Sequence, residues 1–333
     1  MLRIHARTRY AGYVMSEKPN QLSTPRSISK RRRNISILLL IGVSSLLIRV
    51  LMSYNFDKTA LLYVGIPFFV SIFLMYIIKK PEQPTLNRYY GNLVLWSLIV
   101  MLGTSVILFE GFVCVVMFMP IYFGILLIMY LSQLLSCYLQ SKNKGTHYAH
   151  ILPAVIFLSA FEGVIPSASF EREYSITKEL VINATPEEIQ QKLIEPMQLN
   201  VERNWLLSLF PMPSNIEAET LSTGDVHQID FTYHRWFVTN THKGHMKLEL
   251  TQVESDYIRT TFLEDTSYIG NYLKLKGTDI RFIKAENGNT KVALTIYYHR
   301  FLDPAWYFGP IQEYAIGQTA EMLLNELFIP ETA

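Results

Sequence analysis

Long apolar runs in the first half of the chain constrain its fold more than any other feature of the sequence. A helix that crosses the hydrocarbon core of a bilayer needs about 20 predominantly apolar residues. Five segments approach or meet this length: residues 35–52, 60–78, 93–109, 112–139 and 149–166. The sequence therefore predicts that residues 35–166 form an α-helical membrane bundle of about five spans.

Basic residues between these segments predict the orientation of the bundle, because loops rich in Lys and Arg stay on the cytoplasmic side. The stretches RSISKRRR, KKPEQPTLNR and SKNKGTHYAH precede the first span, join the second to the third and join the fourth to the fifth. With five spans, all three lie on one side. Residues 1–34 then form a basic, disordered cytoplasmic segment, and the C-terminal half lies outside. If residues 149–166 only rest on the interface, the C-terminal half is cytoplasmic instead; we expect five spans.

The charge distribution excludes one class of partner. Residues 1–34 carry nine Lys or Arg and one Glu, whereas residues 167–333 carry fourteen Lys or Arg and twenty-three acidic residues. The formal charge of +2 is thus the sum of two opposite ends, and we expect no nucleic-acid partner. Cys114 and Cys137 lie in one apolar run, about 35 Å apart if it is helical, which is too far for a disulfide bond.

Three charged residues fall at one depth in the five-span arrangement, near the outer ends of the spans: Arg49, Glu110 and Glu162. Taken singly, Arg49 and Glu110 are expected to reach the membrane surface along their own side chains. The alternative is a small network of arginine and glutamate that ties the bundle to the C-terminal domain, because charges at membrane depth pair with one another. The sequence leaves both interpretations open.

From Phe170 onward the pattern changes to short strands separated by turns. YSITKELVI alternates as a strand does, and in NATPEEIQQKL Thr185 and Pro186 supply a helix N-cap and first helical residue. A second short helix is expected around NVERNWLLSLF. Asp303 and Pro304 are expected to begin a final helix that runs to about Phe328. Further strands are expected at about 226–238, 245–253, 257–264, 272–284 and 291–301.

This order of elements predicts an α+β helix-grip domain, in which a bent antiparallel sheet wraps around a long C-terminal helix. One stripe of that helix is apolar and is expected to face the sheet: Ile316, Ala320, Leu323, Leu324 and Leu327. A helix laid across the concave face of a bent sheet leaves space between the two layers. Such a space is a ligand cavity by default.

The segments VINATPEEIQQKL and YYHRFLDPAWYFGPIQEYAIGQTAEMLLNEL, in this order, resemble the START-like, polyketide cyclase/dehydratase (SRPBCC) superfamily. Within it, the chain is similar to bacterial membrane-bound members, because FEGFVCVVMFMP resembles their recurring Glu-Gly…Pro span. The resemblance implies a START-like domain over residues 170–330, held at a bacterial inner membrane. The basic loops, with five spans, place that domain on the extracytoplasmic side. The superfamily includes binding proteins, transfer proteins and enzymes, so the resemblance does not choose among these functions.

Strand parity selects candidate ligand-binding residues. The more apolar faces of strands 226–238 and 291–301 include Tyr233, Arg235, Tyr298 and Arg300. If these faces point inward, two arginines and two tyrosines in an apolar chamber suit an anionic headgroup or carboxylate. The alternative is that both arginines lie near strand ends and reach water or pair with acids of the domain, because a buried unpaired charge is unfavourable.

The aromatic cluster Trp306, Tyr307 and Phe308 has two candidate roles, lining the cavity mouth or resting on the membrane interface. We include Tyr307 among the ligand-binding candidates.

The sequence predicts membrane-tethered binding of a hydrophobic or amphipathic small molecule, with lipid as one candidate. Partners are then membrane lipids and that ligand, with no cofactor and no metal, since His234, His242 and His245 lack a convincing acidic partner. One alternative is a cyclase or dehydratase that uses Tyr298, His227 or Glu249 as acid or base. Another is a non-catalytic interaction module. The sequence predicts neither a ligand identity nor an oligomeric state.

Overall fold

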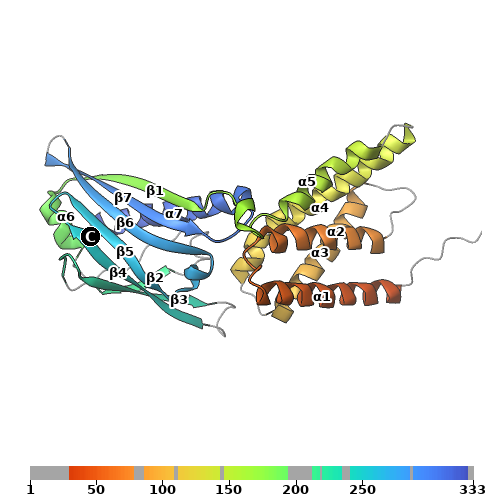
Figure 1. The fold of residues 1–333 in the computed structure, drawn as a ribbon, viewed down its shortest axis with the longest axis horizontal. Helices are drawn as coiled ribbons and strands as arrows, with labels where there is room; N and C mark the ends of the chain where they lie inside the picture. The colour runs from red at the N-terminus through yellow and green to blue at the C-terminus, as the bar shows by residue number, and fades with distance from the viewer. Residues whose placement is uncertain are drawn as a thin grey trace, which may run out of the picture.

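The structure, a computed structural model, describes residues 30–78, 86–108, 112–142, 146–193, 212–217, 220–234, 241–285 and 288–328. A bundle of helices from the first half of the chain stands beside a sheet domain from the second half (Figure 1). The two parts meet where the first turn of the last helix touches the bundle. The candidate functional site lies at this junction.

The helices of the bundle are α1 (Lys30–Ser53), the π-helix η1 (Leu61–Gly65) that leads into α2 (Ile66–Ile77), α3 (Leu86–Leu108), α4 (Phe112–Ser141), the 3-10 helix η2 (Thr146–His150) and α5 (Ile151–Ser159). In Figure 1, α1 and α2 run side by side, α3 crosses obliquely, and α4 and α5 run together at an angle to them. Their shared core includes Ile37, Leu74, Leu93, Val100 and Leu126.

Three helices of the described chain are long and apolar enough to cross a membrane: Arg32–Ser53, Arg88–Leu108 and Val115–Ser141. The expected second and fifth spans form shorter apolar helices, Leu61–Ile77 and Tyr148–Ser159. The latter is only about 18 Å long at 1.5 Å per residue, against a hydrocarbon core of about 30 Å. Beyond Ser159 the chain turns at Gly163, which has φ +83°, so the rest of the predicted fifth span is not helical. The prediction of five spans is therefore not supported.

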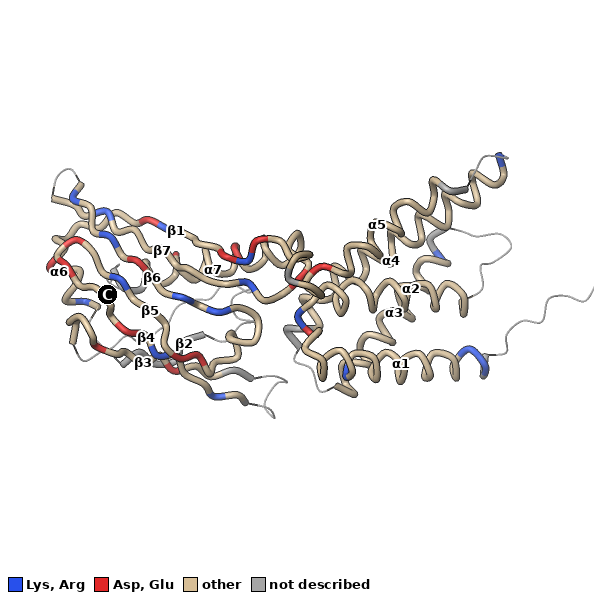
Figure 2. Tube along the Cα trace, in the orientation of Figure 1, with Lys and Arg blue, Asp and Glu red and all other residues tan. Residues whose placement is uncertain are grey.

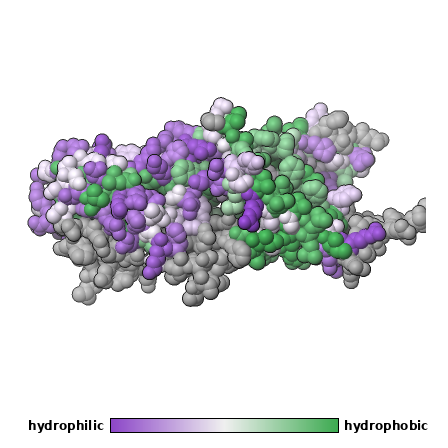
Figure 3. Space-filling view, turned by 60° about the horizontal axis from the view of Figure 1, so that its bottom comes forward, coloured by the Kyte–Doolittle hydropathy of each residue, from purple (hydrophilic) through white to green (hydrophobic). Residues whose placement is uncertain are grey.

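The surface of the bundle is apolar, as that of a membrane protein is. Large apolar side chains point outward on every long helix, among them Leu38, Leu46, Val106 and Leu131. Figure 3 shows this hydrophobic surface over the bundle and a largely hydrophilic surface over the sheet domain. Arg32 is near the beginning of α1 and Lys142 directly follows α4. Figure 2 shows these ends of α1 and α4, with Lys and Arg in blue, on the side of the bundle that is far from the sheet domain.

In the described part of the C-terminal half, seven antiparallel strands form one sheet with the order β1-β7-β6-β5-β4-β3-β2. The strands are β1 (Glu173–Ile182), β2 (Met212–Glu217), β3 (Val226–His234), β4 (Thr241–Val253), β5 (Tyr257–Asp265), β6 (Leu273–Lys284) and β7 (Thr290–Arg300). The five later strands match their predicted positions to within a few residues. Strand β2 was not predicted, and the expected helix around residues 200–210 lies outside the described residues.

Helix α7 (Ala305–Phe328) lies against β1 and β7, on the face of the sheet that buries alternate residues of β7. Four residues of the predicted apolar stripe of α7 are confirmed: Ile316, Ala320 and Leu324 are buried in the core with Val292 and Ile296, and Leu323 packs against it partly buried. The side chain of Leu327 lies outside the described part of the structure. The short helix α6 (Pro186–Lys192) begins with the predicted cap, in which Thr185 and Glu188 exchange hydrogen bonds as a capping box. The arrangement of sheet and helix is consistent with the predicted helix-grip fold.

Candidate functional site

A buried ionic cluster lies where α7 begins. The side chains of Arg300 and Asp303 are both 0% exposed, and the Arg300 guanidinium donates to the Asp303 carboxylate at 2.6 Å. Arg172, just before β1, also donates to Asp303. One carboxylate thus offsets two guanidinium groups, a geometry in which charge-assisted hydrogen bonds are strong. Asp303 was predicted as the N-cap of the last helix; its carboxylate pairs with these arginines instead.

Glu162, from the turn after α5, provides the acceptor for the start of α7. Its carboxylate accepts a hydrogen bond from the backbone N–H of Ala305 at 2.8 Å, while its carbonyl accepts from the N–H of Ala60 at 3.0 Å. Burial raises the pKa of the Glu162 carboxyl, and the hydrogen bond from Ala305 opposes this effect. A residue of the helical half therefore holds the first turn of the C-terminal helix.

Of the predicted network of Arg49, Glu110 and Glu162, the described residues show only Glu162 joining the bundle to the sheet domain. Arg49 is exposed on α1, and Glu110 lies outside the described residues. Glu162 does connect bundle and domain, but it does so through Ala305 of α7. The arginines near it come from the sheet domain, because folding brings the loop before β1 and the end of β7 to the same place.

The residues of the aromatic cluster, Trp306, Tyr307 and Phe308, have different surroundings at the junction. Phe308 is 1% exposed, and its ring packs edge to face against the ring of Tyr63 in η1. The centroids of the two rings are 4.7 Å apart. The Tyr307 hydroxyl donates to the backbone carbonyl of Met117 in α4. Trp306 is 59% exposed. Tyr307 and Phe308 therefore dock the sheet domain onto the bundle, whereas Trp306 faces outward.

The other predicted site residues do not share one described chamber. Tyr298 is fully buried in the core, and its ring stacks on that of Tyr174 with centroids 5.6 Å apart. Arg300 lies on the same inner face of β7 but pairs with Asp303. Tyr233 is the penultimate residue of β3, and Arg235 lies outside the described residues. Pairing with an acid of the domain was the alternative interpretation of Arg300.

Among the residues considered for acid–base or metal chemistry, His227 and His242 lie within hydrogen-bond distance of backbone carbonyl groups. The Nε2 of His227 lies 2.8 Å from the backbone carbonyl of Thr220. The Nε2 of His242 lies 3.1 Å from the carbonyl of Thr266, and Glu249 is a half-buried residue of β4. Within the described ranges, no group of three His, Cys, Asp or Glu side chains is placed to hold a metal ion.

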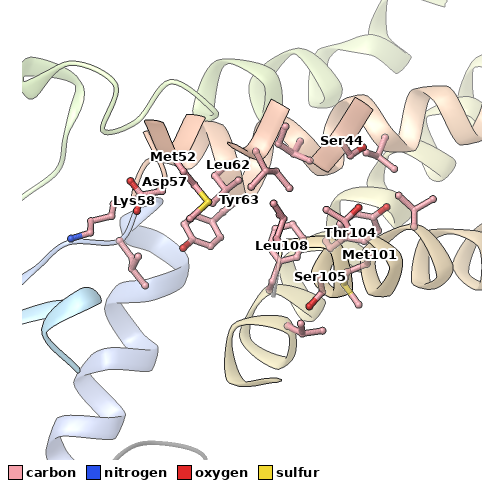
Figure 4. A pocket seen from close by; sticks show the side chains of 18 of the residues that line it. Ser44, Met52, Asp57, Lys58, Leu62, Tyr63, Met101, Thr104, Ser105 and Leu108 are labelled. Carbon is pink, nitrogen blue, oxygen red and sulfur yellow. The ribbon is translucent and has the colours of Figure 1, made fainter. Parts of the chain in front are cut away.

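A cavity of about 310 Å³, which we call the junction cavity, opens between the bundle and the sheet domain. Figure 4 shows side chains of the helical half, among them Ser44, Leu62, Tyr63 and Leu108, facing one another around it. The lining is mainly apolar, from α1, η1, α2, α3 and α4: Ile48, Met52, Leu62, Ile66, Val70, Val100, Met101, Leu108, Val115 and Phe118. On the other side Tyr268, Asn271, Tyr272 and Leu302 of the sheet domain close it.

Three residues of the lining have a hydroxyl group without a hydrogen-bond partner among the described residues: Thr104 and Ser105 of α3, and Tyr122 of α4. Thr104 and Ser105 are consecutive, and they are buried at 7% and 6% exposure. A serine in a helix ordinarily donates to a carbonyl of the preceding turn, as Ser45 does to Ile41 at 2.8 Å. Sequence reasoning missed the cavity because its lining comes from distant segments. The adjacent hydroxyls within an apolar run were the available signal.

No family model and no curated protein matches the chain. Among solved structures, a START superfamily protein from Mycobacterium smegmatis matches 46% of this chain and 93% of its own, with 13% identity and a TM-score of 0.32. An aromatase/cyclase from Streptomyces sp. R1128 matches 46% and 93%, with 10% identity and a TM-score of 0.29. Norcoclaurine synthase from Thalictrum flavum matches 46% and 84%, with 12% identity and a TM-score of 0.31. The description of the fold rests on the strand order and the placement of α7.

Proposed function

We propose that this protein is a membrane-anchored helix-grip protein that binds a hydrophobic or amphipathic small molecule in the junction cavity. The cavity itself carries the proposal: about 310 Å³ of space, lined by apolar side chains, with buried hydroxyls at Thr104 and Ser105 that lack partners. Small-molecule sites combine an apolar wall with a few polar groups in this way. The described residues between the sheet and α7 form the hydrophobic core, so the junction cavity supports binding better than the interior of the grip does.

The position of the cavity suits a ligand that is poorly soluble in water. Most of its wall comes from helices whose outer faces are apolar, and its other wall comes from the hydrophilic domain. A molecule that partitions into the bilayer is concentrated near such a site, in the same way that tethering raises an effective concentration. The sheet domain then closes the other side of the cavity over the ligand.

The charge distribution supports an extracytoplasmic sheet domain in a bacterial inner membrane. The ends of α1 and α4 near Arg32 and Lys142 lie on the side of the bundle that is far from the sheet domain (Figure 2), and basic residues favour the cytoplasmic side. Alkaline phosphatase fused after Ala333 should be active, because this enzyme folds only outside the cytoplasm. An inactive fusion with full expression would place the domain in the cytoplasm.

Ligand binding is tested by filling the cavity. Val100 of α3 is buried in the lining, whereas Leu102 of the same helix is exposed and lies outside it. Native mass spectrometry of the full chain, extracted in its own lipids, should show a bound small molecule in the wild type and in Leu102→Phe. The Val100→Phe variant should lose it, because the larger ring occupies the space. A wild-type protein free of bound mass, or equal retention by both variants, would contradict the proposal.

A further inference from the structure

We infer that the ligand of the junction cavity is an uncharged lipophile that carries a hydroxyl or carbonyl oxygen, held by Thr104 and Ser105. This inference rests on the proposed function and adds the chemical class of the ligand. Three features of the lining lead to it: the size of the space, the type of its polar groups and the state of its charges.

The size of the cavity limits the ligand to one chain or one compact ring system. Its volume of about 310 Å³ is at the lower end of the range of about 300–1,000 Å³ that is typical of small-molecule sites. A phospholipid with two acyl chains and a headgroup needs more space than this. Leu62, Ile66 and Val100 supply an apolar wall for the body of a smaller molecule.

The polar groups deep in the lining are hydroxyls, which both donate and accept hydrogen bonds. Thr104 and Ser105 are consecutive residues of α3, and Ser44 of α1 lines the same space. The free energy of burying a hydroxyl without a partner is unfavourable by about 1–3 kcal/mol, so a ligand oxygen that pairs with one is favoured. A ligand with a hydroxyl or carbonyl group offers such an oxygen, whereas a plain hydrocarbon does not.

The charges in the lining do not favour an anionic ligand. Asp57 and Lys58 are the charged residues among the described lining side chains. The Lys58 ammonium lies 4.2 Å from the centroid of the Phe301 ring and is thereby engaged by the sheet domain. Arg300 and Arg172, behind this wall, both bond to Asp303. A carboxylate or phosphate in the cavity would therefore be repelled by Asp57, while the Lys58 ammonium is drawn toward the Phe301 ring.

The inference is tested with a matched set of photoreactive probes on the full chain in phosphatidylcholine nanodiscs. Dodecanol, 2-dodecanone, dodecanoic acid, dodecylamine and dodecane each carry a diazirine on the same chain carbon, and the labelled peptides are mapped by mass spectrometry. The alcohol and the ketone should label α1 and α3 about 5- to 10-fold more than dodecane does, which is the effect of one or two hydrogen bonds. Stronger labelling by the acid or the amine would overturn the inference.

Variants decide whether the two hydroxyls are responsible. The double substitution Thr104→Val, Ser105→Ala removes both with little change in volume, so labelling by dodecanol should fall to the level of dodecane. Ser45→Ala is the control, because its hydroxyl already bonds to Ile41. Unchanged preference for the alcohol in the double variant would refute the roles of Thr104 and Ser105. If no probe, dodecane included, labels the lining, the proposed function itself fails.

Discussion

The carboxylate of Glu162 accepts a hydrogen bond from the backbone N–H of Ala305, a residue 143 positions later in the chain. The first N–H groups of a helix have no partner within it, and a carboxylate there also interacts favourably with the helix dipole. In this protein the acceptor for α7 is provided by the helical half rather than by the segment before α7. Attachment of the two halves and formation of the last helix are therefore coupled.

Two substitutions of Glu162 should distinguish the effect of its hydrogen bond on stability from the effect of its charge. Glu162→Ala removes the acceptor and should lower the free energy of unfolding by about 1 kcal/mol, as loss of a helix cap does. Glu162→Gln keeps an oxygen at the same place without the buried charge, and its stability should equal or exceed that of the wild type. Thermal unfolding in detergent measures both. Equal losses in the two variants would show that the charge, not the hydrogen bond, matters.

The raised pKa of the Glu162 carboxyl predicts how the stability of the protein changes with pH. Burial raises the pKa of this carboxyl above its ordinary value of 4.5, so between these two pKa values the folded state binds more protons than the unfolded state. The contribution of Glu162 is fully present below about pH 4.5 and is lost as pH rises through the folded pKa. The difference in melting temperature between wild type and Glu162→Gln should therefore widen as pH rises across this window. A difference that is constant with pH would contradict the shift.

Gly163 should not accept a side chain. Its φ of +83° is unfavourable for other residues, and a Cβ at this position would overlap the Asp303 carboxylate. Gly163→Ala should destabilise the fold by roughly 3–4 kcal/mol, since backbone strain and displacement of the ionic cluster act together. Gly224 has φ +95° with open space around it, so Gly224→Ala should show only the backbone effect of about 1 kcal/mol. Similar melting temperatures for both variants would argue against the clash.

Alanine substitutions of Phe308 and Trp306 should differ sharply in their effect on the free energy of unfolding, although the two residues are close together in α7. Phe308→Ala removes a fully buried ring that packs on Tyr63, and it should reduce the free energy of unfolding by about 3–5 kcal/mol. Trp306→Ala changes an exposed side chain and should alter stability in detergent by less than about 0.5 kcal/mol. Chemical denaturation of both variants tests this. A mild effect of Phe308→Ala would mean that the junction is not held by this contact.

Loss of the Asp303 charge should be among the most damaging single changes. Asp303→Asn leaves the buried Arg300 guanidinium without its counter-charge, which should destabilise the protein by about 3–5 kcal/mol. The control is Glu321→Gln, which breaks an exposed pair with Lys178 at 3.4 Å and should have an effect below about 1 kcal/mol. A melting temperature of Asp303→Asn close to that of the control would show that the cluster contributes little.

The sequence alone determined the class of each half, because local patterns carry that information. Apolar runs indicated the bundle, alternation and turn signals located six strands (β1 and β3 to β7) to within a few residues, and the cap at Thr185 was confirmed. Four residues of the stripe of α7 were confirmed for the same reason, since periodicity records which face is buried. Where a pattern was long but broken by polar residues, as around Glu162, it overestimated the length of the helix.

Only the tertiary structure decided what lies at the junction. Asp303 lies 131 positions after Arg172 in the sequence, and no local pattern indicates that an acid after α5 bonds to α7. The junction cavity has the same origin, because its wall combines α1, η1, α2, α3 and α4 of the bundle with two separate segments of the sheet domain. Local periodicity shows which side chains are buried, but not which buried side chains meet. Long-range packing makes that choice, and the proposed ligand site is one of its results.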